Sequence, residues 1–406
     1  MDTPQVLATS QLESRCEDIP PGRKKLNLNA IPSQGPFLSI IDLDLTVACN
    51  LRCRYCFKEK WSEHMEEQVA FDAIVWLLYA SGPVEQLYVN FMGGEPMLRF
   101  PLIKRLVPFA KRRAWRVGKT IHFGITTNCT LVTDEVVDFW KQWGMGFHTS
   151  IDGTPEIQDH NRPTADRQGS SRLVEHAVPK ILACRPMTMA RSTVVPEGAG
   201  SLVDNYKYFR SLGYKNIGFA TAGHDLWSEE AVATFEAEWS KLGDIVIDEY
   251  RAGRQVYLSG IDVVVEAIIR NERYQHLCGA GRGTVLIDIH GDIWPCHRWS
   301  KKAEGAWRIG NIYRQFDDAV RSQLDVPSQA KLVEEDCETC VAALVCSGGC
   351  PAENLEETGC PFKRHETACK LTRIITRVGQ RVHDVLYGEG NELFMKQYYN
   401  RQEQAA

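Results

Sequence analysis

The feature that most constrains this chain is a regular alternation of short β-rich runs with longer amphipathic runs, which fills about half of its 406 residues. The run at 39–46 is predicted to be a strand, and the run at 66–81 has the spacing of an amphipathic helix. Five more pairs follow, with strands predicted at 86–92, 121–127, 146–152, 189–195 and 215–222 and helices at 101–115, 134–143, 171–183, 201–213 and 228–252. Six consecutive strand–helix units predict a parallel sheet with helices packed outside it. Because a complete barrel of this type has eight units, we expect an α/β fold with a partial (β/α)6 TIM-like barrel.

The alternation stops near residue 260, and glycine, proline and cysteine then become frequent. We therefore expect a small cysteine-rich α+β domain after the barrel, with a terminal helix at 372–387. The predicted domains are an N-terminal extension at 1–36, the barrel at 37–260, the cysteine-rich domain at 261–388 and a C-terminal tail at 389–406.

The charge balance excludes two classes of partner. Lys and Arg number 47 against 52 Asp and Glu, a net charge of −5, which is not the surface of a general nucleic-acid or anionic-membrane binder. No apolar run reaches the ~18 residues of a membrane span, and the N-terminus shows no signal peptide. We expect a cytoplasmic protein. The chain has 14 cysteines, and in a reducing cytosol those that are densely and regularly spaced are predicted to be metal ligands rather than disulfides.

Three of the cysteines lie close together after the first predicted strand. Cys49, Cys53 and Cys56 are separated by three and two residues. The carboxyl ends of parallel strands are where such folds place active sites. Three thiolates can hold three irons of a four-iron cluster and leave the fourth iron open to another ligand. A zinc loop lacking one ligand remains an alternative on spacing alone.

A second motif follows the next predicted strand, and it consists of Gly93, Gly94, Glu95 and Pro96. Paired glycines let a ligand approach the backbone closely, and a neighbouring carboxylate can bind an ammonium group. The same residues also fit an ordinary tight turn.

The two motifs together, CNLRCRYC and GGEP, resemble those of the radical S-adenosylmethionine (radical SAM) superfamily, and the resemblance extends over about residues 39–250. It implies that Cys49, Cys53 and Cys56 hold a 4Fe–4S cluster, whose open iron binds the amine and carboxylate of SAM. It further implies SAM contacts by the GGEP residues Gly93, Gly94, Glu95 and Pro96.

The resemblance assigns further SAM contacts to Tyr55, near the adenine, and to Ser150, at the end of the fourth strand, with Arg172 as a contact to the carboxylate. One position departs from the family, because Cys129 stands where a glycine usually follows Thr-Asn. The implied chemistry begins with one electron from the reduced cluster, which cleaves SAM to a 5′-deoxyadenosyl radical. That radical then removes a hydrogen atom from an unactivated carbon of the substrate.

The cysteine spacing of the second half resembles the SPASM domain, the auxiliary-cluster module of many radical SAM enzymes that modify peptides. The resemblance implies two auxiliary 4Fe–4S clusters, one held by Cys278, Cys296 and Cys350 and the other by Cys337, Cys340, Cys346 and Cys369. Where several members carry a further cysteine, this chain has Thr284. The first auxiliary cluster therefore has either an open iron or Cys360 as its fourth ligand. Structural zinc is the alternative for the whole set.

His297 follows Cys296 in the sequence PCHRW. In anaerobic sulfatase-maturing enzymes, which this region resembles, an aspartate at that position acts as a catalytic base. An imidazole can also accept a proton near neutral pH, so His297 is the candidate catalytic residue, with a structural hydrogen bond as the alternative.

The resemblance favours an enzyme that modifies a peptide, with an oxidative side-chain crosslink in the maturation of a ribosomal peptide natural product as the leading hypothesis. Its expected partners are a precursor peptide, a low-potential donor such as ferredoxin or flavodoxin, and a separate leader-binding protein. Neither nucleic acid nor a membrane is expected. The alternatives are a carbohydrate dehydrogenase or epimerase, peptide oxidation of the sulfatase-maturase type, and a non-catalytic iron–sulfur electron carrier.

Overall fold

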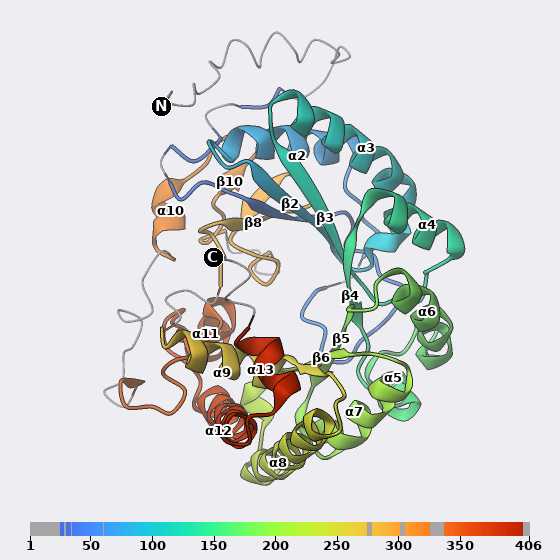
Figure 1. The fold of residues 1–406 in the computed structure, drawn as a ribbon. Helices are drawn as coiled ribbons and strands as arrows, with labels where there is room; N and C mark the ends of the chain where they lie inside the picture. The colour runs from blue at the N-terminus through green and yellow to red at the C-terminus, as the bar shows by residue number, and fades with distance from the viewer. Residues whose placement is uncertain are drawn as a thin grey trace.

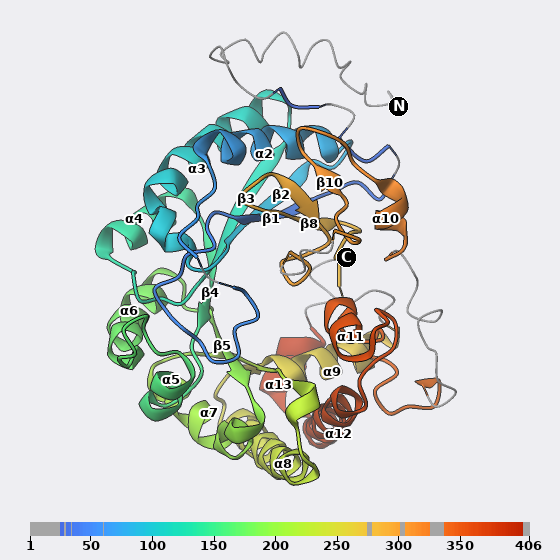
Figure 2. The same ribbon diagram turned by 180° about the vertical axis from the view of Figure 1, so that it is seen from behind.

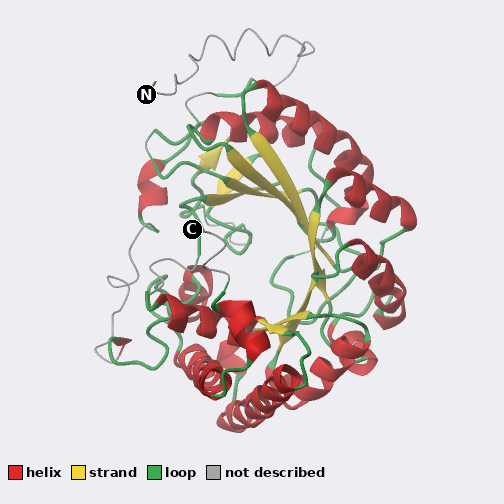
Figure 3. Ribbon diagram, viewed as in Figure 1, coloured by secondary structure: helices red, strands yellow, loops and turns green. Residues whose placement is uncertain are grey.

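The computed structural model describes residues 25–27, 30–33, 35–59, 61–273, 278–300, 305–324 and 337–400. They form an open ring with strands along its inner wall and helices outside (Figure 1). Colouring by secondary structure shows the same two layers (Figure 3). Most of the predicted N-terminal extension, including Cys16, lies outside the described residues.

The strands are β1 (Ile40–Asp44), β2 (Gln86–Met92), β3 (Thr120–Thr127), β4 (Gly146–Ser150), β5 (Met189–Val194), β6 (Asn216–Thr221), β7 (Tyr257–Leu258), β8 (Thr284–Ile287), β9 (Asp292–Trp294) and β10 (Gly310–Asn311). The α-helices are α2 (Glu67–Ala80), α3 (Phe100–Arg116), α4 (Asp134–Trp143), α5 (Pro155–Asn161), α6 (Ser171–Cys184), α7 (Leu202–Ser211), α8 (Glu229–Arg251), α9 (Ser259–Arg270), α10 (Asp318–Ser322), α11 (Pro351–Thr358), α12 (Glu366–Gly388) and α13 (Glu392–Tyr398). The 3-10 helices within the described residues are η1 (Pro96–Arg99), η2 (Pro196–Ser201) and η3 (His224–Leu226).

The described strands form one sheet in the order β10-β9-β8-β1-β2-β3-β4-β5-β6-β7. All neighbours from β1 to β7 pair in parallel, which confirms the predicted partial barrel. The cysteine-rich region joins the same sheet, because β8 pairs in parallel with β1 and continues into the antiparallel strand β9. The two predicted domains therefore share one continuous sheet.

Alternation along β1 gives the ring a polar interior. Ile41 and Leu43 are fully buried in the core between sheet and helices. Asp42 and Asp44 consequently project from the concave face of the sheet. Asn90 of β2 also faces this lumen, since its amide Nδ2 donates to Asp42 Oδ1 at 3.1 Å.

Among the described helices, none combines the length and the apolar character that a membrane span needs.

The C-terminal helices lie beside the last barrel units, and α12 runs along α8 in both views (Figures 1 and 2). The segment assigned to the C-terminal tail contains α13, which packs against the core because Phe394 is fully buried. The predicted boundary at residue 260 falls inside α9.

Gly379 allows α12 to approach α9 closely, because a Cβ at this position would lie 2.7 Å from Cβ of Val264. We expect Gly379→Ala to lower the free energy of unfolding by about 1–3 kcal/mol, the usual cost of overpacking. Gly388→Ala, on the same helix, meets nothing within 4 Å and is expected to be neutral or slightly stabilising. Urea unfolding of both variants checks this, and an unaltered Gly379→Ala would contradict the packing described.

Candidate active site

The loop that carries Cys49, Cys53 and Cys56 begins just beyond β1 and pairs with the segment 161–165. The backbone N–H of Arg52 donates to the carbonyl of Pro163 at 2.7 Å, and that of Arg54 donates to Asn161 at 3.0 Å. An isolated antiparallel bridge continues this pairing. The loop is therefore held in an extended conformation against a segment distant in sequence.

The three thiols are half-buried. The backbone N–H of Leu51 lies 3.4 Å from Cys49 Sγ, and the amide Nδ2 of Asn128 lies 3.9 Å from the same sulfur. Hydrogen-bond donors around a sulfur favour its thiolate form, which is the form that binds metal. In donor chemistry, these residues fit an iron–sulfur cluster.

The paired glycines bring the second motif against the cysteine loop. A Cβ on Gly93 would lie 2.2 Å from the carbonyl oxygen of Thr46, and one on Gly94 would lie 2.1 Å from that of Ala48. The N–H groups of Gly94 and Glu95 donate to the same two carbonyls at 2.8 and 2.9 Å. Only glycine permits this approach, so the glycines first serve the contact between the two loops.

Glu95 is almost completely buried beside that contact. Its carboxylate accepts hydrogen bonds from Met97 N at 3.0 Å, Thr127 Oγ1 at 2.8 Å and Asn128 N at 2.8 Å. Burial raises the pKa of Glu95 to about 7, even though these three donors favour the ionised form. Over the described residues no ion pair joins Glu95 to a cation, so a ligand ammonium group would complete its environment.

Tyr55 links the cysteine loop to a buried charge pair. Its hydroxyl donates to Asp152 Oδ2 at 2.6 Å, and Arg162 Nη2 donates to Asp152 Oδ1 at 2.8 Å. The N–H of Thr193, on β5, also donates to Asp152 Oδ1, at 2.9 Å. Burial raises the pKa of Tyr55 well above its ordinary value. In the described part of the chain, Arg162 Nε is buried without a hydrogen-bond partner.

The remaining predicted SAM contacts lie at different depths. Ser150 ends β4 and is half-buried, Pro96 is buried at the start of η1, and Arg172 is exposed on the first turn of α6. Cys129 is fully buried and has φ 65°, a left-handed conformation that favours the glycine usual at this position.

The structure brings Cys278, Cys296 and Cys350 into electrostatic contact. Burial, followed by the neighbouring Cys350 and Cys278, raises the pKa of Cys296 to about 12. Cys360 lies on the turn after α11, where its N–H donates to Thr358 Oγ1 at 3.3 Å. Thr284 begins β8.

The second set of thiols gathers around two arginines, and it consists of Cys337, Cys340, Cys346 and Cys369. Arg364 Nη1 lies 3.2 Å from Cys346 Sγ, and Arg373 Nε lies 3.4 Å from Cys340 Sγ. Burial alone would raise the pKa of Cys340, but the hydrogen bond from Arg373 lowers it below its ordinary value. Two guanidinium groups offset the negative charge that several thiolates would carry.

His297 faces the lumen at the junction of the two regions. Its Nδ1 lies 3.6 Å from Oδ2 of Asp42, and its ring centroid lies 5.7 Å from that of Phe57, which directly follows Cys56. The auxiliary cysteine region and the first cysteine loop therefore border the same space.

Several residues of the site were not predicted from the sequence, namely Asp42, Asn128, Asp152, Arg162, Arg364 and Arg373. The position of Asp152, two residues beyond the end of β4, is a usable signal, because the carboxyl ends of barrel strands carry site residues. The partners Arg162 and Arg364 have no comparable signal.

The comparisons with known proteins agree with this geometry. Residues 43–197 match the radical SAM superfamily. The cysteine-type anaerobic sulfatase-maturating enzyme of Clostridium perfringens is 24% identical over 340 residues, which cover 78% of this chain and 89% of that enzyme. Native anSMEcpe with bound AdoMet and Cp18Cys peptide has a TM-score of 0.72 at 20% identity, over 86% of this chain and 99% of that chain. Streptococcus suis SuiB bound to precursor peptide SuiA has a TM-score of 0.55 at 15% identity, over 82% and 76%.

Residues 43–197 are therefore a radical SAM domain, as predicted. The chain is an enzyme that contains a radical SAM domain and is related in sequence to anaerobic sulfatase-maturating enzymes, and the two solved structures share its fold. Such an enzyme uses SAM and a 4Fe–4S cluster. Over the described residues, no three His, Cys, Asp or Glu side chains converge closely enough to hold a single metal ion. Thiolates are the usual ligands of a 4Fe–4S cluster, so the donor chemistry of Cys49, Cys53 and Cys56 suits such a cluster.

We expect Asp152→Asn to destabilise the protein by about 3–5 kcal/mol, because it leaves the buried Arg162 charge without its partner. Glu67→Gln is the control, since Glu67 and its partner Arg105 are both well exposed and their pair is worth less than about 1 kcal/mol. Denaturant unfolding measures both variants. Equal losses would contradict the role given to Asp152.

The raised pKa of Glu95 predicts a pH dependence of stability in the protein without SAM. The folded state binds a proton more tightly than the unfolded state, so stability falls as pH rises from about 4.5 to about 7 and is then level. The loss is about 3 kcal/mol. Unfolding measured between pH 5 and 8 should show this fall in the wild type and lack it in Glu95→Gln. Parallel curves for the two proteins would contradict it.

Proposed function

We propose that this protein is a radical SAM enzyme with a SPASM-type auxiliary region that modifies a peptide, forming an oxidative side-chain crosslink. The observation that carries the proposal is the shared lumen, in which His297, next to Cys296, lies near both Asp42 of β1 and Phe57. Phe57 belongs to the loop that carries Cys49, Cys53 and Cys56, here called the SAM-cluster loop. A substrate held there can meet both cysteine regions at once. The fold is shared with two proteins that were solved with bound peptides.

In this proposal Cys49, Cys53 and Cys56 hold the cluster that binds SAM. When bound and reduced, that cluster supplies the electron that cleaves SAM to a 5′-deoxyadenosyl radical able to take a hydrogen atom from the substrate. Glu95 receives the ammonium group of SAM, which favours its ionised form. Arg162 has a buried donor without a partner and is better placed than the exposed Arg172 to receive the carboxylate.

The auxiliary region would hold two further 4Fe–4S clusters. Cys278, Cys296 and Cys350 would hold the first, and Cys337, Cys340, Cys346 and Cys369 the second. Forming a crosslink removes one electron and one proton from the substrate after the hydrogen atom has left. The auxiliary clusters would accept that electron, and the neighbouring His297 or Asp42 would accept the proton.

The lumen offers polar groups that can orient a peptide. His148 and Arg191 project from β4 and β5, and burial lowers the pKa of both side chains. The negative charge of Glu353, on α11, acts in the opposite direction and favours the charged form of Arg191. The guanidinium of Arg191 is exposed on the lumen side and can bind a peptide carbonyl or carboxylate, because hydrogen bonds from charged donors are strong.

Peptide oxidation of the sulfatase-maturase type is the second candidate, favoured by the 24% identity to the Clostridium perfringens enzyme over most of both chains. The imidazole of His297 in place of the usual aspartate weighs against it. Asp42, 3.6 Å away, supplies a carboxylate at the same place from a different strand.

The proposal predicts that the anaerobically reconstituted protein contains roughly eight to twelve irons and forms 5′-deoxyadenosine with dithionite. Replacing Cys49, Cys53 and Cys56 by alanine should abolish the nucleoside, whereas replacing Cys184, on α6, should not. Precursor peptides encoded beside the gene should lose hydrogen on incubation with the enzyme. Tandem mass spectrometry then separates a crosslink, which blocks fragmentation between the joined residues, from an aldehyde trapped by a hydrazine. Nucleoside formation stimulated by a sugar and by no peptide would overturn the peptide assignment.

A further inference from the structure

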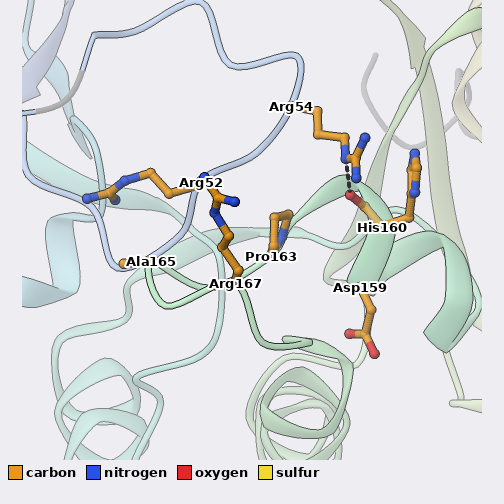
Figure 4. Close-up of a pocket in the computed structure, with 7 residues that line it drawn as sticks. All are labelled: Arg52, Arg54, Asp159, His160, Pro163, Ala165 and Arg167. Atoms are coloured by element: carbon orange, nitrogen blue, oxygen red, sulfur yellow. Dashed lines mark hydrogen bonds between the residues drawn. The ribbon is translucent and has the colours of Figure 1, made fainter.

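A basic pocket lies on the outer side of the SAM-cluster loop. It has a volume of about 600 Å³ and is lined by Arg52, Arg54, Asp159, His160, Pro163, Ala165 and Arg167. Figure 4 shows the guanidinium groups of three arginines distributed around it. We call this set the arginine pocket. The arginine pocket is locally positive, whereas the net charge of the whole chain is −5.

Strand-like alternation explains why the arginines lie outside. The loop pairs with residues 161–165 from Leu51 to Arg54, just before the turn at 54–55, and the exposure of its side chains alternates over this stretch. Arg52 and Arg54 are exposed, whereas Cys53 is half-buried between them and Tyr55 turns inward to Asp152. The arginine pocket is therefore the outer surface of the segment whose inner side carries a cluster thiol.

The charge of the pocket is not cancelled by its acidic member. Asp159 accepts hydrogen bonds from the N–H of Ser171 at 2.7 Å and from its hydroxyl at 3.0 Å, so it serves the first turn of α6. Arg54 Nε donates to the carbonyl of His160 at 2.8 Å, and Arg52 Nη1 donates to that of Cys49 at 2.6 Å. These bonds to neutral carbonyls fix two of the arginines without neutralising them.

We propose that the arginine pocket is the docking site for a small, acidic one-electron carrier that reduces the SAM-binding cluster. This rests on the proposed function, because the cluster must receive one electron for each reductive cleavage. Three guanidinium cations, two of them fixed by hydrogen bonds, favour an acidic surface and steer its approach, and electron-transfer complexes need only a small interface. The substrate lumen lies on the other side of the loop, so the carrier and the peptide do not compete.

The test uses Arg167→Glu, because Arg52 and Arg54 also bond backbone carbonyls of the loop or its partner segment. Arg116→Glu is the matched control: Arg116 is exposed at the last turn of α3, at the opposite end of the barrel from the carboxyl ends of the strands. Arg167→Gln serves as a milder variant in case the reversal impairs folding. The probe is a bacterial flavodoxin with its reductase and NADPH.

Calorimetry of the reconstituted enzyme with flavodoxin is expected to show a Kd that Arg167→Glu raises roughly fivefold to tenfold at low ionic strength, an effect that salt diminishes. Flavodoxin-driven formation of 5′-deoxyadenosine should fall in parallel, and dithionite-driven formation should be unchanged. Arg116→Glu should match the wild type in all three measurements.

Equal flavodoxin affinities for the Arg167→Glu and Arg116→Glu variants would overturn the docking site. So would an acidic precursor peptide that displaces flavodoxin and is itself weakened by Arg167→Glu, because the pocket would then be a peptide site. The binding measurement needs no turnover. Failure of the wild type to cleave SAM with dithionite would count against the proposed function, and the calorimetric comparison would still decide the docking site.

Discussion

The arrangement of the site depends on the buried carboxylate of Asp152. This one group accepts hydrogen bonds from Tyr55 in the cysteine loop, from Arg162 after α5 and from the backbone of Thr193 in β5. Three segments that are far apart in the sequence are thus fixed to each other at the carboxyl end of the barrel. Because the carboxylate is fully buried, each of these hydrogen bonds forms in surroundings where an unpaired partner would be costly. The charge pair positions the cysteine loop over the lumen.

The barrel was predictable because its signal is local. Apolar residues repeat along β1 to β6 and α2 to α8 with the periods of strands and helices, and six repeats of one unit leave few topologies. The short elements α5, β7 and α13 give weaker signals, since seven residues or fewer cannot establish a period. Phe394 is fully buried in α13, but a single aromatic residue in a polar terminal segment does not predict a docked helix.

The candidate ligands were predictable for a different reason, namely that thiols at short spacings have few other uses in a reducing cell. Their surroundings were not predictable. Asn128 and Arg373 approach cysteines 79 and 33 residues away in the sequence, through contacts that only the folded chain creates. The glycine pair was predictable only in part. Two adjacent glycines indicate that another group approaches the backbone closely, but the sequence does not identify that group. The structure shows that the first partner of Gly93 and Gly94 is the backbone of the cysteine loop itself.

The continuous sheet holds the two cysteine regions next to each other, as the proposed function requires. Since β8 adds to the free edge of β1, the segment that follows it, with Cys296 and His297, is held beside the first strand of the barrel. An auxiliary domain joined by a flexible linker would leave the distance between the regions variable. Here sheet hydrogen bonds fix one side, and the packing of α12 on α8 and α9 fixes the other. Chemistry that removes a hydrogen atom and then a second electron from the same substrate requires such a fixed separation, because the substrate radical must not diffuse between the two events.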